Sequence, residues 1–409
     1  MKFSKLRQLV LISAIGLVVA TILSGCQIVT IDYLFVATQG STITGSSSTC
    51  PNGEIETYAV DSESGAIRQV DPQVCSGGTT PVALAVSPGY RNLYVANQAD
   101  MNIVHFAVAN SGVLTNKDSV TLPSTPVALA VSADGNTLYV VSGTTSATLT
   151  AYSLSSGTIG SVASQVNLTL PGYAGDTMIP TGVTALANGN AVYVTAYDQS
   201  SYNPGGTTTS TAPPGWVFGF AVGSGGVLTP TPASPYNAGV KPSALVADPT
   251  NRFVYVTDFA SNQLIGFGIY TGNQLNYLLN GPYKSGGEPS AISIDPRGKF
   301  LYVSNALDST VTAYVIDLPT GTPSTAVNTT GSQTNNTDTQ PVAVAVDPAL
   351  GRFVYTANYL GNSVSGFKLN PISGTLVQTQ ATPYPLHGNN PTALVLVPHG
   401  NHASQTVTP

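Results

Sequence analysis

Apolar and polar residues alternate with a period of two through most of this chain. One segment beginning at Pro81 reads PVALAVSPGYRNLYVAN, in which two alternating runs flank a Ser-Pro-Gly turn. A period of two predicts strands rather than helices, and the turn residues between the runs predict a hairpin. The same hairpin pattern recurs at intervals of 45 to 62 residues, beginning at Pro126, Pro180, Pro242, Pro289 and Pro341.

Each hairpin is followed by a third alternating run and usually by a Gly and the start of a fourth. The third runs cover residues 103–108, 149–154, 217–222, 264–269, 311–316 and 364–369. Four short antiparallel strands repeated at this spacing are typical of a β-propeller blade. The sequence therefore predicts an all-β fold built of four-stranded antiparallel blades.

The two ends of the repeat region complement each other. Residues 33–37 match the second strand of a unit and residues 55–60 the third, whereas the missing first strand appears at 391–398. The C-terminal strand would thus complete the first blade, which gives six full repeats and one composite blade. We expect a closed seven-bladed propeller over residues 33–398, because closure pairs both terminal edges, followed by a flexible tail over 399–409.

Composition agrees with this fold and excludes others. Only 8% of the residues are charged, far too few for a helical bundle or a coiled coil. The chain has 20 Tyr, much Val and Thr and no charge blocks, which excludes a disordered body.

Residues 1–25 are predicted to be an export signal. Three basic residues precede an apolar run over 9–22, which is too short to span a membrane and typical of a signal peptide. The run ends in Leu-Ser-Gly-Cys, which resembles the bacterial lipobox, and that resemblance implies lipidation of Cys26. Residues 26–32 would then be a short lipidated tether. Gln27, where an Asp would resemble an inner-membrane retention signal, favours the outer membrane or the cell surface.

Charge narrows the choice of partners. Removal of the signal leaves 10 basic residues against 19 acidic ones. Nucleic-acid binding needs a basic surface, so we expect no nucleic-acid partner. Attachment to the membrane would depend on the acyl chains rather than on charge. We expect a monomer.

Two cysteines remain after processing, Cys50 and Cys75. An exported protein meets an oxidising compartment, so an even pair predicts a disulfide. The alternative is two free thiols. The chain contains no Cys-x-x-Cys motif.

The second strand of several repeats ends in a recurring motif, seen as YVAN at 94–97, YVSN at 302–305 and YTAN at 355–358. Together with the preceding Pro-x-x-Leu-x-Val strand, this motif resembles the seven-bladed lactonase-like propellers, a superfamily that includes the propeller-type phosphogluconolactonases and the YVTN-repeat surface proteins. The resemblance covers about residues 33–398. It implies the fold, but fold alone does not assign an activity.

The resemblance also implies where a site would lie: at the channel mouth, where first strands begin and second strands end. The family's enzymes carry His and Arg after the first-strand Pro and Glu after the second-strand Asn. This chain departs from that pattern, with Ser243-Ala244 after Pro242 and Phe259 after Asp258. His387 lies a few residues before the strand at 391–398 that completes the first blade. It could reach the channel mouth, but we expect it to be a solvated histidine in a loop.

Charged residues at the predicted mouth are few. Lys241 precedes Pro242, Glu288 precedes Pro289, and Asp258 ends a second strand. If the protein is an enzyme, Asp258 or Glu288 could act as the general base and Lys241 as the electrostatic partner. The alternative is a partly exposed Lys–Glu ion pair with little effect on stability.

Asn97, Asn305 and Asn358 occupy the position that corresponds to Asp258 on other blades. Amide and carboxylate oxygens around a polar channel could bind a sugar-like ligand or a hard cation such as Ca²⁺. The alternative is that these side chains cap turns at the strand ends. We expect no other cofactor.

Two functional hypotheses follow from the sequence. The leading hypothesis is a lipid-anchored binding scaffold without catalysis that holds a protein or carbohydrate partner on its loops. The polar segments 199–215 and 319–340, expected to be loops, are the candidate surfaces. The alternative is an exported, lactonase-like hydrolase of sugar or other neutral lactones, which could depend on a cation.

Overall fold

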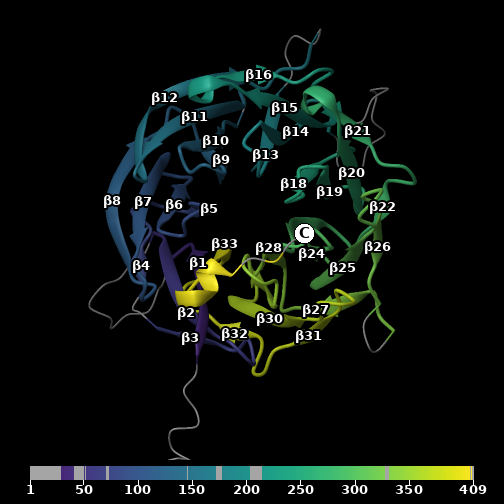
Figure 1. The fold of residues 1–409 in the computed structure, drawn as a ribbon. Helices are drawn as coiled ribbons and strands as arrows, with labels where there is room; N and C mark the ends of the chain where they lie inside the picture. The colour runs from purple at the N-terminus through teal and green to yellow at the C-terminus, as the bar shows by residue number, and fades with distance from the viewer. Residues whose placement is uncertain are drawn as a thin grey trace, which may run out of the picture.

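The computed structural model describes residues 29–40, 50, 52–70, 73–144, 146–171, 177–202, 214–327, 331–405 and 407. These residues form seven antiparallel sheets arranged as the blades of a closed ring (Figure 1). This arrangement confirms the predicted seven-bladed propeller. The predicted signal, the lipidation site at Cys26 and parts of the segments 199–215 and 319–340 lie outside the described residues.

Each blade places its first strand at the centre of the ring. From blade 1 to blade 7 these strands are β33 (Pro391–Pro398), β5 (Pro81–Val86), β9 (Pro126–Val131), β13 (Met178–Ala185), β18 (Pro242–Ala247), β23 (Pro289–Ile294) and β28 (Pro341–Val346). Six of them begin at the repeat proline, because the first residue of a strand tolerates the missing N–H.

The second strands carry the repeated tyrosine. They are β1 (Thr30–Thr38), β6 (Asn92–Asn97), β10 (Thr137–Ser142), β14 (Ala191–Asp198), β19 (Phe253–Asp258), β24 (Phe300–Asn305) and β29 (Phe353–Asn358). The third strands are β2 (Glu54–Asp61), β7 (Asn102–Val108), β11 (Thr148–Ser155), β15 (Gly215–Val222), β20 (Gln263–Ile269), β25 (Thr310–Ile316) and β30 (Ser363–Leu369).

The outer edge of most blades is divided into two short pieces. The fourth strands are β3 (Ile67–Gln69), β8 (Leu114–Thr121), β12 (Thr158–Asn167), β16 (Leu228–Pro230), β21 (Leu275–Tyr277), β26 (Pro323–Thr325) and β31 (Leu376–Gln378). Five blades add a second piece on the third strand: β4 (Val74–Cys75), β17 (Tyr236–Asn237), β22 (Tyr283–Lys284), β27 (Thr334–Asn336) and β32 (Tyr384–Pro385). The prediction of a loop throughout 319–340 is therefore wrong at β26 and β27, which pair with the outer edge of β25.

The ring is closed within blade 1, as predicted. Strand β33 pairs with β1 in antiparallel register, with Val36 opposite Leu394 and Asp32 opposite Pro398. The two ends of the propeller therefore share one sheet (Figure 1).

Apolar side chains fill the space between neighbouring blades. The tyrosine of the second strand is almost fully buried in six blades. In five of these its hydroxyl donates to a backbone oxygen in the next blade: Tyr94 to Gly157 (2.7 Å), Tyr193 to Asn273 (2.8 Å), Tyr255 to Gly321 (2.7 Å), Tyr302 to Gly374 (2.9 Å) and Tyr355 to Gly65 (2.7 Å). The last of these bonds joins blade 7 to blade 1.

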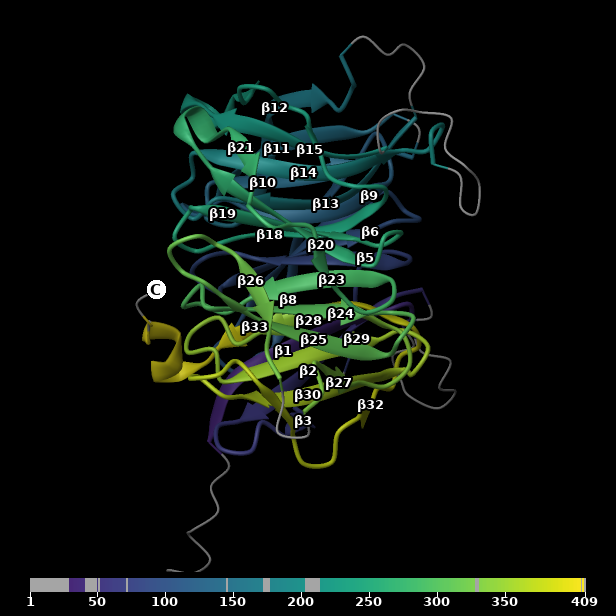
Figure 2. The ribbon, with the colours of Figure 1, turned by 90° about the vertical axis from the view of Figure 1, so that its right-hand side faces the viewer.

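Three short 3₁₀ helices complete the described part of the chain: η1 (Ser224–Gly226), η2 (Thr271–Asn273) and η3 (Gly400–Ser404). Helix η3 lies within the predicted tail, on one face of the ring (Figure 2), and its His402 side chain is buried. Among the described residues, none of the helices has the length and apolar character of a membrane span.

Candidate functional site

The face on which first strands begin and second strands end is called the mouth face below, and the other face the opposite face. The catalytic and ligand-binding residues predicted from the sequence lie at strand ends or connections on the mouth face. This placement follows from the blade register, in which Pro242 pairs with Asp258 and Pro289 with Asn305.

Asp258 is fully buried and has several hydrogen-bond partners within the protein. Its carboxylate accepts the backbone N–H groups of Val240 and Lys241, both at 2.9 Å, and the side-chain amide of Gln263 at 2.9 Å. These bonds hold the connection between blades 4 and 5 against the end of β19. Any catalytic or ligand-binding role of Asp258 stays a prediction.

The three asparagines are also fully buried. Asn97 donates to Ser76 O at 3.2 Å and to Asn102 Oδ1 at 2.8 Å. The other two donate to pairs of hydroxyl groups on the third strand: Asn305 to Thr310 and Thr312 (3.0 and 2.9 Å), and Asn358 to Ser363 and Ser365 (3.0 and 2.9 Å). Their proposed role as ligands for a sugar or for Ca²⁺ stays a prediction.

Lys241 lies among aromatic rings. Its Nζ is 4.8 Å from the ring centroid of Phe259, 5.2 Å from that of Tyr202 and 5.6 Å from that of Tyr197. These distances are within the range of cation–π contacts. Among the described residues no ion pair joins Lys241 to Glu288, whose own backbone N–H donates to Asn262 Oδ1 at 2.7 Å.

A different group of side chains on the mouth face combines charge, burial and partial exposure. Glu54 and Glu56 lie at the start of β2 in the composite blade, and both are fully buried. Glu56 accepts the Tyr58 hydroxyl at 2.5 Å and the backbone N–H groups of His387 and Gly388 at 3.1 and 2.8 Å. Both carboxylate oxygens of Glu56 therefore accept hydrogen bonds from donors within the protein.

Glu54 has fewer partners. Its Oε1 accepts the Thr38 hydroxyl at 3.3 Å, whereas its Oε2 is buried without a hydrogen-bond partner in the described part of the protein. Burial, and then the nearby Glu56 carboxylate, raise the pKa of Glu54 to about 7. A buried carboxyl group that titrates near neutral pH is typical of functional sites.

His387 connects these buried carboxylates to solvent. Its Nδ1 lies 3.4 Å from Glu56 Oε2, and its side chain is 49% exposed, whereas that of Glu56 is 0% exposed. The backbone at Gly388 packs closely against Thr38 and Glu54, and only glycine fits there, because a Cβ would overlap Thr38 Oγ1 and Glu54 Oε1. An exposed imidazole beside a buried carboxylate can accept a proton from water.

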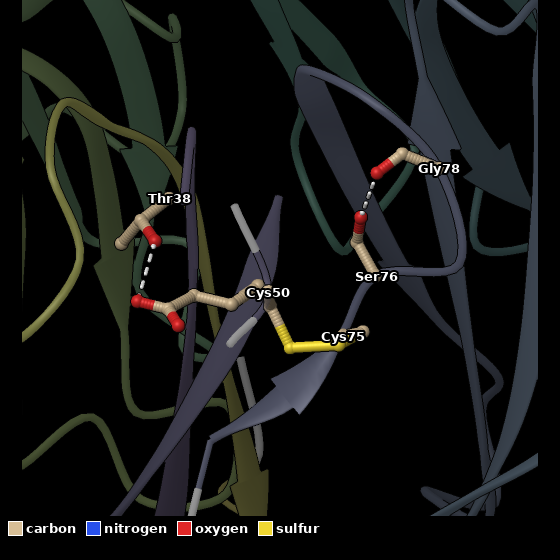
Figure 3. Close-up of a disulfide and its surroundings, with 6 residues drawn as sticks. Thr38, Cys50, Cys75, Ser76 and Gly78 are labelled. Carbon is tan, nitrogen blue, oxygen red and sulfur yellow. Dashed lines mark hydrogen bonds between the residues drawn. A yellow bond between two sulfur atoms is a disulfide. The ribbon is translucent and has the colours of Figure 1, made fainter. Parts of the chain in front are cut away.

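The disulfide lies beside this group, which we call the Glu54–Glu56–His387 site. Cys50 and Cys75 are bonded, as predicted, and Cys75 pairs with Glu54 across β4 and β2. Figure 3 shows the bond next to Thr38, whose hydroxyl hydrogen bond is drawn as a dashed line. The cross-link fixes the segment before β2 to the strand that pairs with Glu54.

Glu54 and Glu56 could have been found in the sequence by aligning the repeats with one another. In register, Glu54 and Glu56 correspond to Thr310 and Thr312 of blade 6 and to Ser363 and Ser365 of blade 7. A comparison of third-strand starts across the repeats would show two carboxylates in place of neutral side chains. His387 has no such signal, since Glu56 lies far from it in the sequence.

One group of side chains in the described part of the chain could hold a metal ion. It consists of Asp32, Asp347 and His402, all buried. Asp32 lies near the start of β1 and Thr38 at its end, so this group is on the opposite face from the Glu54–Glu56–His387 site. It does not include the asparagine positions for which Ca²⁺ was predicted.

Comparison with known proteins agrees with the fold. The family model described as "Lactonase, 7-bladed beta-propeller" matches residues 20–127 and 101–403. The chain therefore belongs to this family of seven-bladed lactonase-like propellers. No curated protein matches the sequence.

Several solved structures are similar to this chain at low sequence identity. A putative 6-phosphogluconolactonase from Bacteroides fragilis has a TM-score of 0.69 and 17% identity over 91% of this chain and 99% of that one. The periplasmic gluconolactonase of Pseudomonas aeruginosa has a TM-score of 0.67 and 19% identity over 89% of this chain and 99% of that one. At this identity the similarity establishes the fold alone.

Proposed function

We propose that this protein is an exported hydrolase of neutral lactones, with His387 as the general base. The proposal depends on one observation: a half-exposed imidazole whose Nδ1 faces the buried Glu56 carboxylate at 3.4 Å. The family name and the name of the Pseudomonas aeruginosa structure, a periplasmic gluconolactonase, support the same reaction class. The proposal therefore takes up the hydrolase alternative in place of the binding scaffold.

Lactone hydrolysis requires water to attack a ring carbonyl. In the proposed reaction Glu56 orients His387 so that Nδ1 carries its proton, which leaves Nε2 free to accept a proton from the attacking water. The proton then passes to the ring oxygen as the C–O bond breaks, so the product is a hydroxy acid. The Tyr58 hydroxyl and the two backbone N–H groups hold the Glu56 side chain in position during these steps.

The charge of the site selects among lactones. The site contains two glutamates, and the processed chain keeps 19 acidic residues against 10 basic ones. Like charges repel most strongly where water is excluded. We therefore expect an uncharged sugar lactone to react faster than a phosphorylated one.

The test is proton release by the full chain in detergent, with δ-gluconolactone and with its 6-phosphorylated form as substrates. Wild type should exceed the uncatalysed rate with the neutral lactone, and His387→Gln should lower kcat/KM about 100-fold or more. His399→Gln, which changes a partly exposed histidine on the opposite face, is the matched control. If wild type shows no turnover, the hydrolase proposal fails and the binding scaffold, with a protein or carbohydrate partner on the loops, becomes the better hypothesis.

We propose in addition that the protein is held at the cell envelope by lipid on Cys26, at the outer membrane or cell surface. The support is the signal-like segment 1–25, which ends directly before Cys26, and Gln27. Incorporation of labelled palmitate by wild type and its loss in Cys26→Ser would test the anchor. Equal labelling of both proteins would contradict it.

A further inference from the structure

Three buried side chains from distant parts of the sequence meet on the opposite face of the ring. Asp32 belongs to β1, Asp347 directly follows β28, and His402 belongs to η3. His402 Nε2 lies 3.2 Å from Asp347 Oδ1 and 3.4 Å from Asp32 Oδ1. The three candidate ligand atoms all lie within 4.8 Å of one another.

The hydrogen bond between His402 and Gln405 determines which nitrogen of the His402 ring carries the proton. His402 Nδ1 is 2.8 Å from Gln405 Oε1, and an amide oxygen only accepts, so Nδ1 carries a proton. In the neutral ring the Nε2 lone pair therefore points at two carboxylate oxygens. A cation between these atoms, either a proton or a metal ion, is required to offset their repulsion.

Asp32 has fewer hydrogen-bond partners than Asp347. It is fully buried, and neither of its oxygens has a hydrogen-bond partner in the described part of the protein. Asp347, by contrast, accepts the backbone N–H groups of Ala349 at 2.9 Å and Arg352 at 3.0 Å. Burial of a carboxylate without partners is costly.

We propose that Asp32, Asp347 and His402 form a binding site for a divalent transition metal ion of the Zn²⁺ type. Zinc bonds to imidazole nitrogen and carboxylate oxygen measure about 2.0–2.2 Å, which places ligand atoms of a tetrahedron roughly 3.3–3.6 Å apart. The two separations, 3.2 and 3.4 Å, are within about 0.1 Å of this range.

The ligand set also discriminates between metals. An imidazole nitrogen suits Zn²⁺, Co²⁺ or Ni²⁺, whereas Ca²⁺ requires six to eight oxygen ligands. Gln405 fixes the orientation of the His402 ring in the way that outer-shell acceptors do in zinc sites. The inference does not depend on the proposed hydrolase, whose residues are on the mouth face.

The position of the site gives the ion a structural role. Asp32 pairs with Pro398 at the end of the closing strand, and the His399 N–H donates to Ile31 O at 2.6 Å. An ion at this point would join β1, blade 7 and the segment after β33. It would therefore stabilise the closed ring at the place where the two ends of the propeller meet.

The test uses the full chain carrying Cys26→Ser, which removes the thiol that lies outside the disulfide. After metal removal, titration with Zn²⁺ should give one equivalent per chain and raise Tm by roughly 5 °C at about 100 times Kd. Co²⁺ should give the visible absorption bands of a tetrahedral site with nitrogen and oxygen ligands. Asp32→Asn and His402→Gln should each weaken binding about 100-fold or more, and Gln405→Ala about 10- to 100-fold.

The matched control is His105→Gln. It removes another buried histidine that contacts a carboxylate, with Nδ1 2.7 Å from Asp118 Oδ2, and should leave metal binding unchanged. If the Asp32 and His402 variants do not fold, the Co²⁺ spectrum of the parent chain still decides the question. No stoichiometric binding of Zn²⁺ or Co²⁺ by the parent chain, or equal binding by Asp32→Asn, would overturn the proposal and leave a proton as the cation.

Discussion

Blades 7 and 1 solve the same local problem with different chemistry. In blade 7 the Asn358 amide donates to two hydroxyl groups on the third strand, those of Ser363 and Ser365. In blade 1 the two corresponding positions are Glu54 and Glu56. The blade 7 groups satisfy one another, whereas blade 1 places two carboxylates side by side, and one oxygen of Glu54 has no hydrogen-bond partner among the described residues.

The difference indicates which blade is specialised. Neutral hydroxyl pairs at this position, such as Ser363 and Ser365, accept hydrogen bonds from the second strand of their own blade. They require no further partner. A carboxylate pair weakens the fold at neutral pH, because one of its members titrates near pH 7. A local departure that costs stability within a regular repeat is expected at a functional position.

The largest expected effect comes from Glu56. We expect Glu56→Gln to lower kcat/KM for a neutral lactone about 100- to 10,000-fold, because the amide no longer holds His387 in the orientation required of a base. Ser365→Ala changes the corresponding position in blade 7 and should leave turnover unchanged. Steady-state kinetics of both variants would check the comparison, and an equal loss in both would show that the effect is structural.

Glu54 should make the free energy of unfolding depend on pH. Its folded pKa, about 7, lies above the ordinary value of 4.5, so the folded state binds more protons between these values. The free energy of unfolding should therefore fall as pH rises from about 4.5 to 7, by about 1 to 3 kcal/mol. The contribution of Glu54 to this loss should be absent in Glu54→Gln, whose stability should fall less over this range than that of wild type.

Denaturant unfolding of wild type, Glu54→Gln and Ser363→Ala across this pH range would measure the effect. Ser363→Ala is the control, because a serine does not titrate in this window. If the pH dependence of Glu54→Gln equals that of wild type, the Glu54 carboxyl is not a source of it.

The same comparison explains how much the sequence could predict. The blade repeat and the closing strand at 391–398 follow from local periodicity, so the closed seven-bladed ring could be predicted. The bond from Tyr355 to Gly65 could not, because it joins residues from opposite ends of the chain. At Gly65, φ is +69° and a Cβ would overlap the Phe353 ring, so the contact depends on the assembled ring.

The candidate site was partly predictable for the same reason. The sequence placed Lys241, Asp258 and Glu288 on the mouth face because each lies next to a repeat landmark. It did not bring together Glu56 and His387, since only ring closure places the segment before β33 against the start of β2. Nor could it reveal that His402 is buried beside Asp32 and Asp347, because these contacts connect three distant segments.

The smallest expected effect comes from Lys241, which tests whether catalysis belongs to blade 1 alone. Lys241→Met removes a charge that lies 4.8 to 5.6 Å from three aromatic ring centroids, yet keeps most of the apolar stem. Loss of partly exposed cation–π contacts should lower the free energy of unfolding by about 0.5–1 kcal/mol.

Because Lys241 forms no ion pair with Glu288 among the described residues and belongs to the connection between blades 4 and 5, kcat/KM should stay within about 2-fold of wild type. Kinetics and denaturant unfolding of the same sample would separate the two quantities. A large fall in kcat with unchanged stability would instead return the catalytic role to Lys241 and its neighbours Asp258 and Glu288.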